Sequence, residues 1–147
     1  MKIVYRILFI LHIFVGLGAM GGGMMAILNP HSPFGITLKN SPFTSFLIPG
    51  IILFTVIGLG NIISALVIYY KPWFHGYVSS VFGWALVIWI VVQCIMLESV
   101  VALHIIYFII GLIQGTLAMV ILFNQRMFPA NIILYFYKKI CNKWLRQ

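Results

Sequence analysis

Acidic residues are nearly absent from this sequence. Glu98 is the only one among 147 residues, which include nine Lys and Arg. A catalytic pair of carboxylates is impossible with one acidic residue. The chain also has no HExxH, GxSxG or phosphate-binding Gly-Lys-Ser/Thr motif. These absences exclude most enzyme mechanisms, and we expect a protein that is not an enzyme.

Cysteine is equally scarce, and its two positions do not suggest chemistry. Cys94 lies in an apolar run and Cys141 in a basic tail, with neither a CxxC spacing nor an obvious disulfide partner. A bis-histidine haem would need two His at similar depth, which His12 and His104 do not offer. A metal site built from His31, His104 and Glu98 is conceivable, although no helical His spacing supports it. We therefore expect no cofactor and no metal.

Long hydrophobic runs are what the sequence has in place of charge. Charged residues make up only 7% of the chain and apolar residues 63%, whereas soluble domains average about 25% charged residues. About 20 apolar residues are needed for a helix to cross the hydrocarbon core. Four segments meet this length, at about 3–28, 46–70, 77–97 and 102–123. The sequence therefore predicts an all-α, polytopic membrane protein with a four-transmembrane-helix bundle in residues 1–128. The first run is longer than the apolar core of a signal peptide, so we expect it to remain as a span.

The basic residues predict the orientation of the bundle. Only Lys39 falls on one side of the predicted spans, and all the others share the opposite side: Lys2, Arg6, Lys71, Arg126, Lys138, Lys139, Lys143 and Arg146. Positive residues are retained in the cytoplasm. We expect a multi-pass protein of the bacterial plasma membrane with both termini cytoplasmic. The net charge of +8 then follows from topology, and we expect no nucleic-acid partner.

The last segment, 129–147, has an amphipathic pattern. One helical face would carry Ile132, Ile133, Phe136, Ile140 and Trp144, and the opposite face Lys138, Lys139, Asn142, Lys143 and Arg146. This pattern is typical of a helix lying on the inner leaflet, with its basic side chains near anionic head groups. The membrane-surface residues would be Lys138, Lys139, Lys143, Trp144 and Arg146. The segment would serve either as a membrane anchor or as a docking element for a partner.

Small residues recur at four-residue spacing in the predicted spans. Gly18 pairs with Gly22, Gly111 with Gly115, and Gly23 follows Ala19 at the same interval. Such spacing lets helix backbones approach closely in a membrane. The glycines serve either the internal packing of the bundle or a groove for another membrane protein.

Polar residues inside the spans sort into two layers by depth. His12 and Asn61 lie at similar distances from the cytoplasmic side, and Gln114 with Ser64 would join them in an inner layer. Gln93, Glu98 and His104 lie toward the outside, where His31 or Lys39 would complete an outer cluster. Buried polar residues in membranes either hold helices together through hydrogen bonds or serve as functional groups. For Glu98 the alternatives are a water-exposed turn residue, a proton-linked or ligand-binding role with His104, and contact with a partner.

Several short motifs resemble those of small bacterial four-span membrane proteins of mostly unknown function. They are Ser41-Pro42-Phe43, Pro49-Gly50, and Gly83-Trp84 followed by Trp89 and Gln93. The resemblance covers about residues 5–120. With its Ile, Lys and Asn bias, the chain is also similar to the four-span auxiliary proteins of the staphylococcal Sae two-component system. This likeness implies an accessory subunit that binds a sensor histidine kinase together with a lipoprotein.

Two hypotheses of function follow. The first is a non-enzymatic accessory subunit that binds and modulates a larger membrane protein, either a sensor kinase or a transporter, through glycine-lined faces. The second is a small transporter or channel whose polar path involves Glu98, His104, His12 and Asn61. A transporter requires a polar route between the two layers, and an accessory subunit does not.

Overall fold

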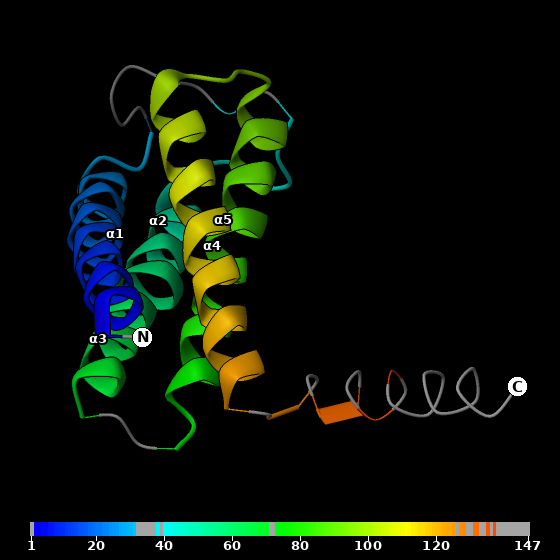
Figure 1. Cartoon of the computed structure of the whole chain (residues 1–147). Coiled ribbons are helices and arrows are strands. Elements are labelled where there is room, and N and C mark those ends of the chain that lie inside the picture. The colour runs from blue at the N-terminus through cyan, green and yellow to red at the C-terminus, as the bar shows by residue number, and fades with distance from the viewer. Residues whose placement is uncertain are drawn as a thin grey trace, which may run out of the picture.

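The computed structural model describes residues 2–31, 38, 40–70, 73–125, 127–128, 131–132, 135 and 137. It contains four helices that are long and apolar enough to cross a membrane (Figure 1). They are α1 (Lys2–Leu28), a composite helix (Leu47–Tyr70), α4 (His75–Leu97) and α5 (Ala102–Asn124). The composite helix consists of α2 (Leu47–Ile52), the π-helix η2 (Leu53–Leu59) and α3 (Gly60–Tyr70). The prediction of an all-helical chain with four apolar helices is confirmed for the described residues.

The amphipathic helix predicted over 129–147 lies almost entirely outside the described residues. Asn131, Ile132, Tyr135 and Tyr137 are described and helical, and all four are exposed. The basic residues Lys138, Lys139, Lys143 and Arg146, and Trp144 with them, lie outside the described part of the chain.

The four long helices pack as two pairs. α1 packs along the composite helix, α4 packs antiparallel to α5, and α3 joins the pairs by contacting α4 (Figure 1). We call the end with the start of α1 and the end of α5 the N-terminal end, and the end with the α4–α5 turn the hairpin end. Tyr69, Tyr70 and Trp73 are strongly exposed at the N-terminal end, as is typical of aromatic side chains at a membrane interface.

Glycines bring the backbones within each pair close together. A Cβ atom on Gly23 would lie 2.7 Å from the backbone nitrogen of Phe54 and 2.9 Å from the carbonyl oxygen of Gly50. A Cβ atom on Gly83 would lie 2.8 Å from the backbone nitrogen of Gly115. Real Cβ contacts are longer, so these positions require glycine for the observed packing.

Backbone hydrogen bonds tie the connection between α1 and α2 to the hairpin end. The Asn40 N–H donates to the Met96 carbonyl at 3.1 Å, and the Phe46 N–H donates to the Pro30 carbonyl at 2.7 Å. The carbonyls at a helix end have no partner within the helix. The first of these bonds therefore satisfies one of the last carbonyls of α4.

Two apolar clusters form the core. The central apolar cluster consists of Val15, Ala19, Ile57, Leu86, Trp89 and Ile90. A second cluster, nearer the N-terminal end, consists of Leu8, Ile68, Ala118 and Ile121. His12 lies between Leu8 and Val15 in the sequence of α1, and Asn61 lies between Ile57 and Ile68. The two clusters therefore enclose a polar layer at the level of His12 and Asn61.

Candidate functional site

The inner polar residues predicted from depth do come together. His12 Nδ1 lies 2.7 Å from Asn61 Oδ1, and Gln114 Nε2 lies 3.2 Å from the same oxygen and 3.2 Å from His12 Nδ1. All three side chains are fully buried. Ser64 does not join them, because its hydroxyl donates to the Gly60 carbonyl at 2.9 Å. The polar layer thus links α1, α3 and α5.

The hydrogen bonds determine which way the groups of the polar layer point. The Asn61 amide donates to the Ile57 carbonyl at 2.8 Å, so its oxygen faces His12 and Gln114. A neutral His12 then donates from Nδ1 to that oxygen. His12 Nε2 and Gln114 Oε1 are buried without a hydrogen-bond partner among the described residues. This arrangement suits a structural role, in which hydrogen bonds hold three helices together. Two acceptors, His12 Nε2 and Gln114 Oε1, are not used by these bonds.

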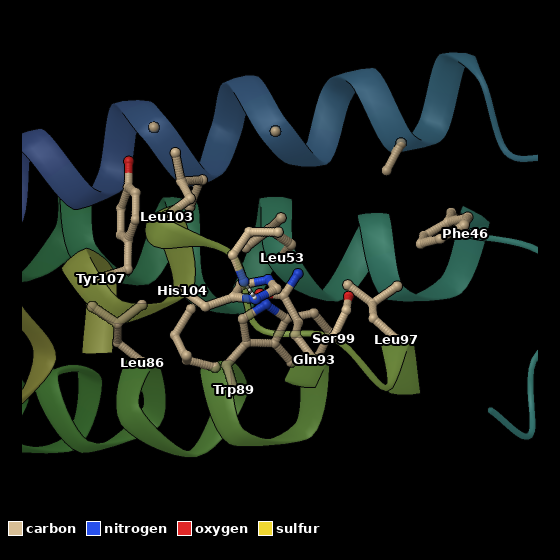
Figure 2. A pocket seen from close by; sticks show the side chains of 16 residues that line it. Phe46, Leu53, Leu86, Trp89, Gln93, Leu97, Ser99, Leu103, His104 and Tyr107 are labelled. Carbon is tan, nitrogen blue, oxygen red and sulfur yellow. Dashed lines mark hydrogen bonds between the residues drawn. The ribbon is translucent and has the colours of Figure 1, made fainter. Parts of the chain in front are cut away.

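A pocket of about 330 Å³ opens at the hairpin end, between the two helix pairs (Figure 2). Its walls come from all four long helices and the α4–α5 turn. The lining is mainly apolar and includes Gly18, Ala19, Gly22 and Ala26 of α1, Phe46, Leu53, Leu86, Trp89, Ile90, Gln93 and Leu97, and Ser99, Val101, Leu103, His104 and Tyr107.

Nitrogen-bearing side chains lie in the middle of this pocket. Figure 2 shows Trp89 and Gln93 rising from α4 toward His104 of α5. Trp89 is 8% exposed, and its indole nitrogen has no hydrogen-bond partner in the described part of the chain. His104 is 7% exposed, and its Nδ1 accepts the Val101 N–H at 3.4 Å. A neutral His104 therefore carries its proton on Nε2, which makes both rings N–H donors.

The five glycines expected in helix packing or partner binding have different surroundings. Gly23 packs against Phe54 and Gly50, while Gly111 packs against Val87 and Gly115 against Trp84. These three positions are buried within the chain. By contrast, Gly18 lies beneath the Tyr107 hydroxyl, and a Cβ atom on Gly22 would meet only Leu53 Cδ2, at 3.6 Å. Gly22 therefore leaves open space in the pocket, whereas Gly18 makes room for the Tyr107 hydroxyl.

The predicted outer cluster is divided in the structure. Gln93 and His104 line the pocket, whereas Glu98 is exposed in the turn after α4 and is not part of the lining. His31 is exposed, and Lys39 lies outside the described residues. No three His, Cys, Asp or Glu side chains gather among the described residues. His31, His104 and Glu98 thus do not form the conceivable metal site.

Sequence reasoning missed a polar cluster at the N-terminal end. The Tyr5 hydroxyl lies 3.2 Å from His75 Nε2, and Gln125 Nε2 lies 3.3 Å from the same nitrogen and 3.4 Å from that hydroxyl. Tyr5 lies near the start of α1, His75 at the start of α4 and Gln125 just after α5. The depth argument that placed His12 beside Asn61 would have found this cluster.

Trp89 was also missed as a polar group. Trp89 belongs to one of the motifs that resemble small four-span proteins. Its indole N–H, in the middle of a predicted apolar span, indicates a polar group inside the bundle. Tryptophan N–H groups usually find a partner when they are buried.

Comparison of the chain with protein-family models, with curated proteins and with solved structures found no match. The function proposed below therefore rests on the geometry of the described residues.

Proposed function

We propose that this chain is a non-enzymatic accessory subunit that binds and modulates a larger membrane protein. The observation that carries the proposal is Gly21, on the outer face of α1. Gly21 is exposed, and a Cβ atom on it would meet no atom within 4 Å. A glycine in a helix interior lowers the stability of the helix by about 1 kcal/mol relative to an alanine. No described residue requires glycine at this position.

The surroundings of Gly21 suit a partner helix. Leu17, Met24 and Met25 are exposed around it, so Gly21 forms a notch between large apolar side chains. Such a notch lets the backbone of another helix approach closely in a bilayer, and methionine side chains adapt to varied surfaces. The docking face that we propose is therefore Leu17, Gly21, Met24 and Met25. It replaces Gly23, Gly111 and Gly115, which pack within the bundle.

The core favours this proposal over the transporter alternative. Val15 and Ile57 of the central apolar cluster are buried and lie, along their helices, between His12 and Asn61 of the polar layer and the pocket-lining residues Gly18 and Leu53. A transport path would need polar or hydrated groups at that level. Glu98, which the transporter hypothesis places at the outer mouth, is exposed and does not itself line the pocket, although its neighbours Leu97 and Ser99 do.

The membrane orientation and the partner that we propose are those expected from the sequence. Both termini would lie in the cytoplasm of a bacterium, with the basic tail on the anionic inner leaflet. The partner would be a sensor histidine kinase with an associated lipoprotein, or else a transporter.

Co-purification tests the proposal. The tagged full chain would be isolated from its native membrane in mild detergent, and a photoreactive residue at Met24 would crosslink the neighbour. We expect a stoichiometric membrane partner. Gly21→Leu should lower its recovery by about fivefold, because losing close helix packing costs on the order of 1 kcal/mol.

The matched control is Ile109→Leu, at an exposed position of α5, which should leave recovery unchanged. The accessory role would be ruled out by a lone monomer with no crosslink at Met24. It would also be ruled out by equal recovery with Gly21→Leu and the parent chain.

A further inference from the structure

The hairpin-end pocket has the size of a small-molecule site. Its volume is about 330 Å³, within the range of about 300–1,000 Å³ usual for such sites.

Access to the pocket is from the apolar flank of the bundle. Gly18 is exposed on α1 beside the Tyr107 hydroxyl, and Leu103, one turn before Tyr107 on α5, is 63% exposed. Both residues belong to the lining. A molecule dissolved in the bilayer can thus enter between α1 and α5 without passing through water.

The polar groups of the pocket define the chemistry of its ligand. Among the described residues, no Lys, Arg, Asp or Glu belongs to the lining, so a charged group would be buried there without a counterion from them. Trp89 Nε1–H is a buried donor without a partner among the described residues, and His104 Nε2–H is a second donor from the facing helix. Buried donors are stabilised by an acceptor oxygen. The rest of the lining suits an apolar chain.

We infer that this pocket binds a neutral amphiphile with an apolar chain and a carbonyl or ester oxygen. The oxygen accepts hydrogen bonds from Trp89 and His104. The chain lies along Gly22 and Ala26, where the absence of large side chains leaves room for it. A glycerolipid ester and a prenyl quinone share this chemistry. The inference does not depend on the accessory role, because the docking face around Gly21 points away from the pocket.

Ligand titration tests the inference. The purified, delipidated full chain in detergent would be titrated with dioctanoylglycerol, a short-tailed prenyl quinone and an alkane of similar length, and binding would be followed by native mass spectrometry. We expect saturable binding of at least one oxygen-bearing probe, about tenfold tighter than the alkane. The probe that saturates identifies the source of the ligand. If neither binds more tightly than the alkane, the inference is overturned.

Two adjacent glycines provide a matched pair of variants. Gly22→Leu fills the pocket, since a side chain there meets only Leu53 at ordinary contact distance. Gly21→Leu makes the same change one residue away, where the side chain points outward. We expect Gly22→Leu to weaken binding by about tenfold and Gly21→Leu to leave it unchanged. Equal binding by Gly22→Leu and the parent chain would overturn the inference.

Trp89→Phe tests the hydrogen bond separately from the volume. It keeps an aromatic ring and removes the N–H donor. We expect weaker binding of the oxygen-bearing probe by about threefold to tenfold, with alkane binding unchanged. An equal loss for both probes would contradict the donor role. Gly22→Leu should keep the partner that Gly21→Leu loses, so the two proposals fail independently.

Discussion

At the scale of single residues, the lone carboxylate has a backbone role. Glu98 follows α4 with φ 47° and ψ 32° and is the only described non-glycine residue with positive φ. This left-handed conformation costs an L-residue roughly 1–2 kcal/mol. The sequence singled out Glu98 for its rarity, but rarity carries no information on conformation. Glycine is the usual residue at this position after a helix.

We expect Glu98→Gly to raise the free energy of unfolding by about 1 kcal/mol, because glycine adopts the left-handed conformation without strain. Thermal unfolding in detergent, followed by circular dichroism, measures the change. Glu98→Gln is the control, since it removes the charge and keeps the strain, and it should match the parent. A gain in stability with Glu98→Gln instead would show that charge, and not backbone strain, is the cost at this turn.

Residue-scale prediction succeeded where depth alone decides contact. His12, Asn61 and Gln114 were placed together by counting along their spans, because a straight helix converts residue number into depth. Depth does not give direction around the helix. Gly21, Gly22 and Gly23 have nearly the same depth and face the outside, the pocket and the composite helix. Only the positions of neighbouring helices distinguish them.

At the scale of elements, the π-helix η2 is the feature that the sequence did not predict. Apolar runs identify a span because run length is a local property. The hydrogen-bond pattern within a span depends on packing, here of Gly58 against Met20 and of Gly23 against Phe54. The wider π turn accommodates one extra residue. On either side of η2, Gly50 packs against Ala26 and Gly23 of α1, and Asn61 is hydrogen-bonded to His12 of the same helix.

Deletion of single residues tests this reading. Removing Val56 from η2 should convert the π turn to an α turn and leave both flanking faces in place. Removing Ile63 from α3 should rotate the following residues by about 100° and displace Ala65 and Ile68 from the core. We expect the first deletion to preserve thermal stability. The second should cost about 2 kcal/mol or more in lost packing.

Val56 and Ile63 are similarly exposed, at 46% and 51%, so the two deletions remove comparable side chains. Circular dichroism melts in the same detergent compare them. Equal damage from both would mean that η2 does not hold the register.

At the scale of the whole molecule, the apolar cluster between the polar layer and the pocket sets what the bundle can conduct. A charge crossing that level would lose its solvation without a polar partner. We expect proton and potassium flux through proteoliposomes of the full chain to equal that of empty liposomes. A pH-sensitive dye and a potassium ionophore control measure it. Flux in the parent that is lost with Glu98→Gln would instead favour the transporter hypothesis.

The number of helices and their order could be predicted from the sequence, because run lengths and a short α4–α5 connection leave few arrangements. The pocket could not. It arises where the two helix pairs diverge, between residues of α1 and α5 that are about eighty positions apart, such as Gly18 and Leu103. A local sequence pattern does not show where two helix pairs separate. The pocket-lining glycines Gly18 and Gly22 were therefore not distinguishable from glycines that pack helices together.

The hydrogen bond from Asn40 to Met96 also bears on biosynthesis. Asn40 precedes the second long helix and Met96 ends the third, so the ribosome must make three spans before this bond can form. Asn40, which is synthesised early, can thus be hydrogen-bonded to Met96 only after α4 has been made. The bond can form before α5 is made, so this contact at the hairpin end has to wait for α4 but not for the whole chain.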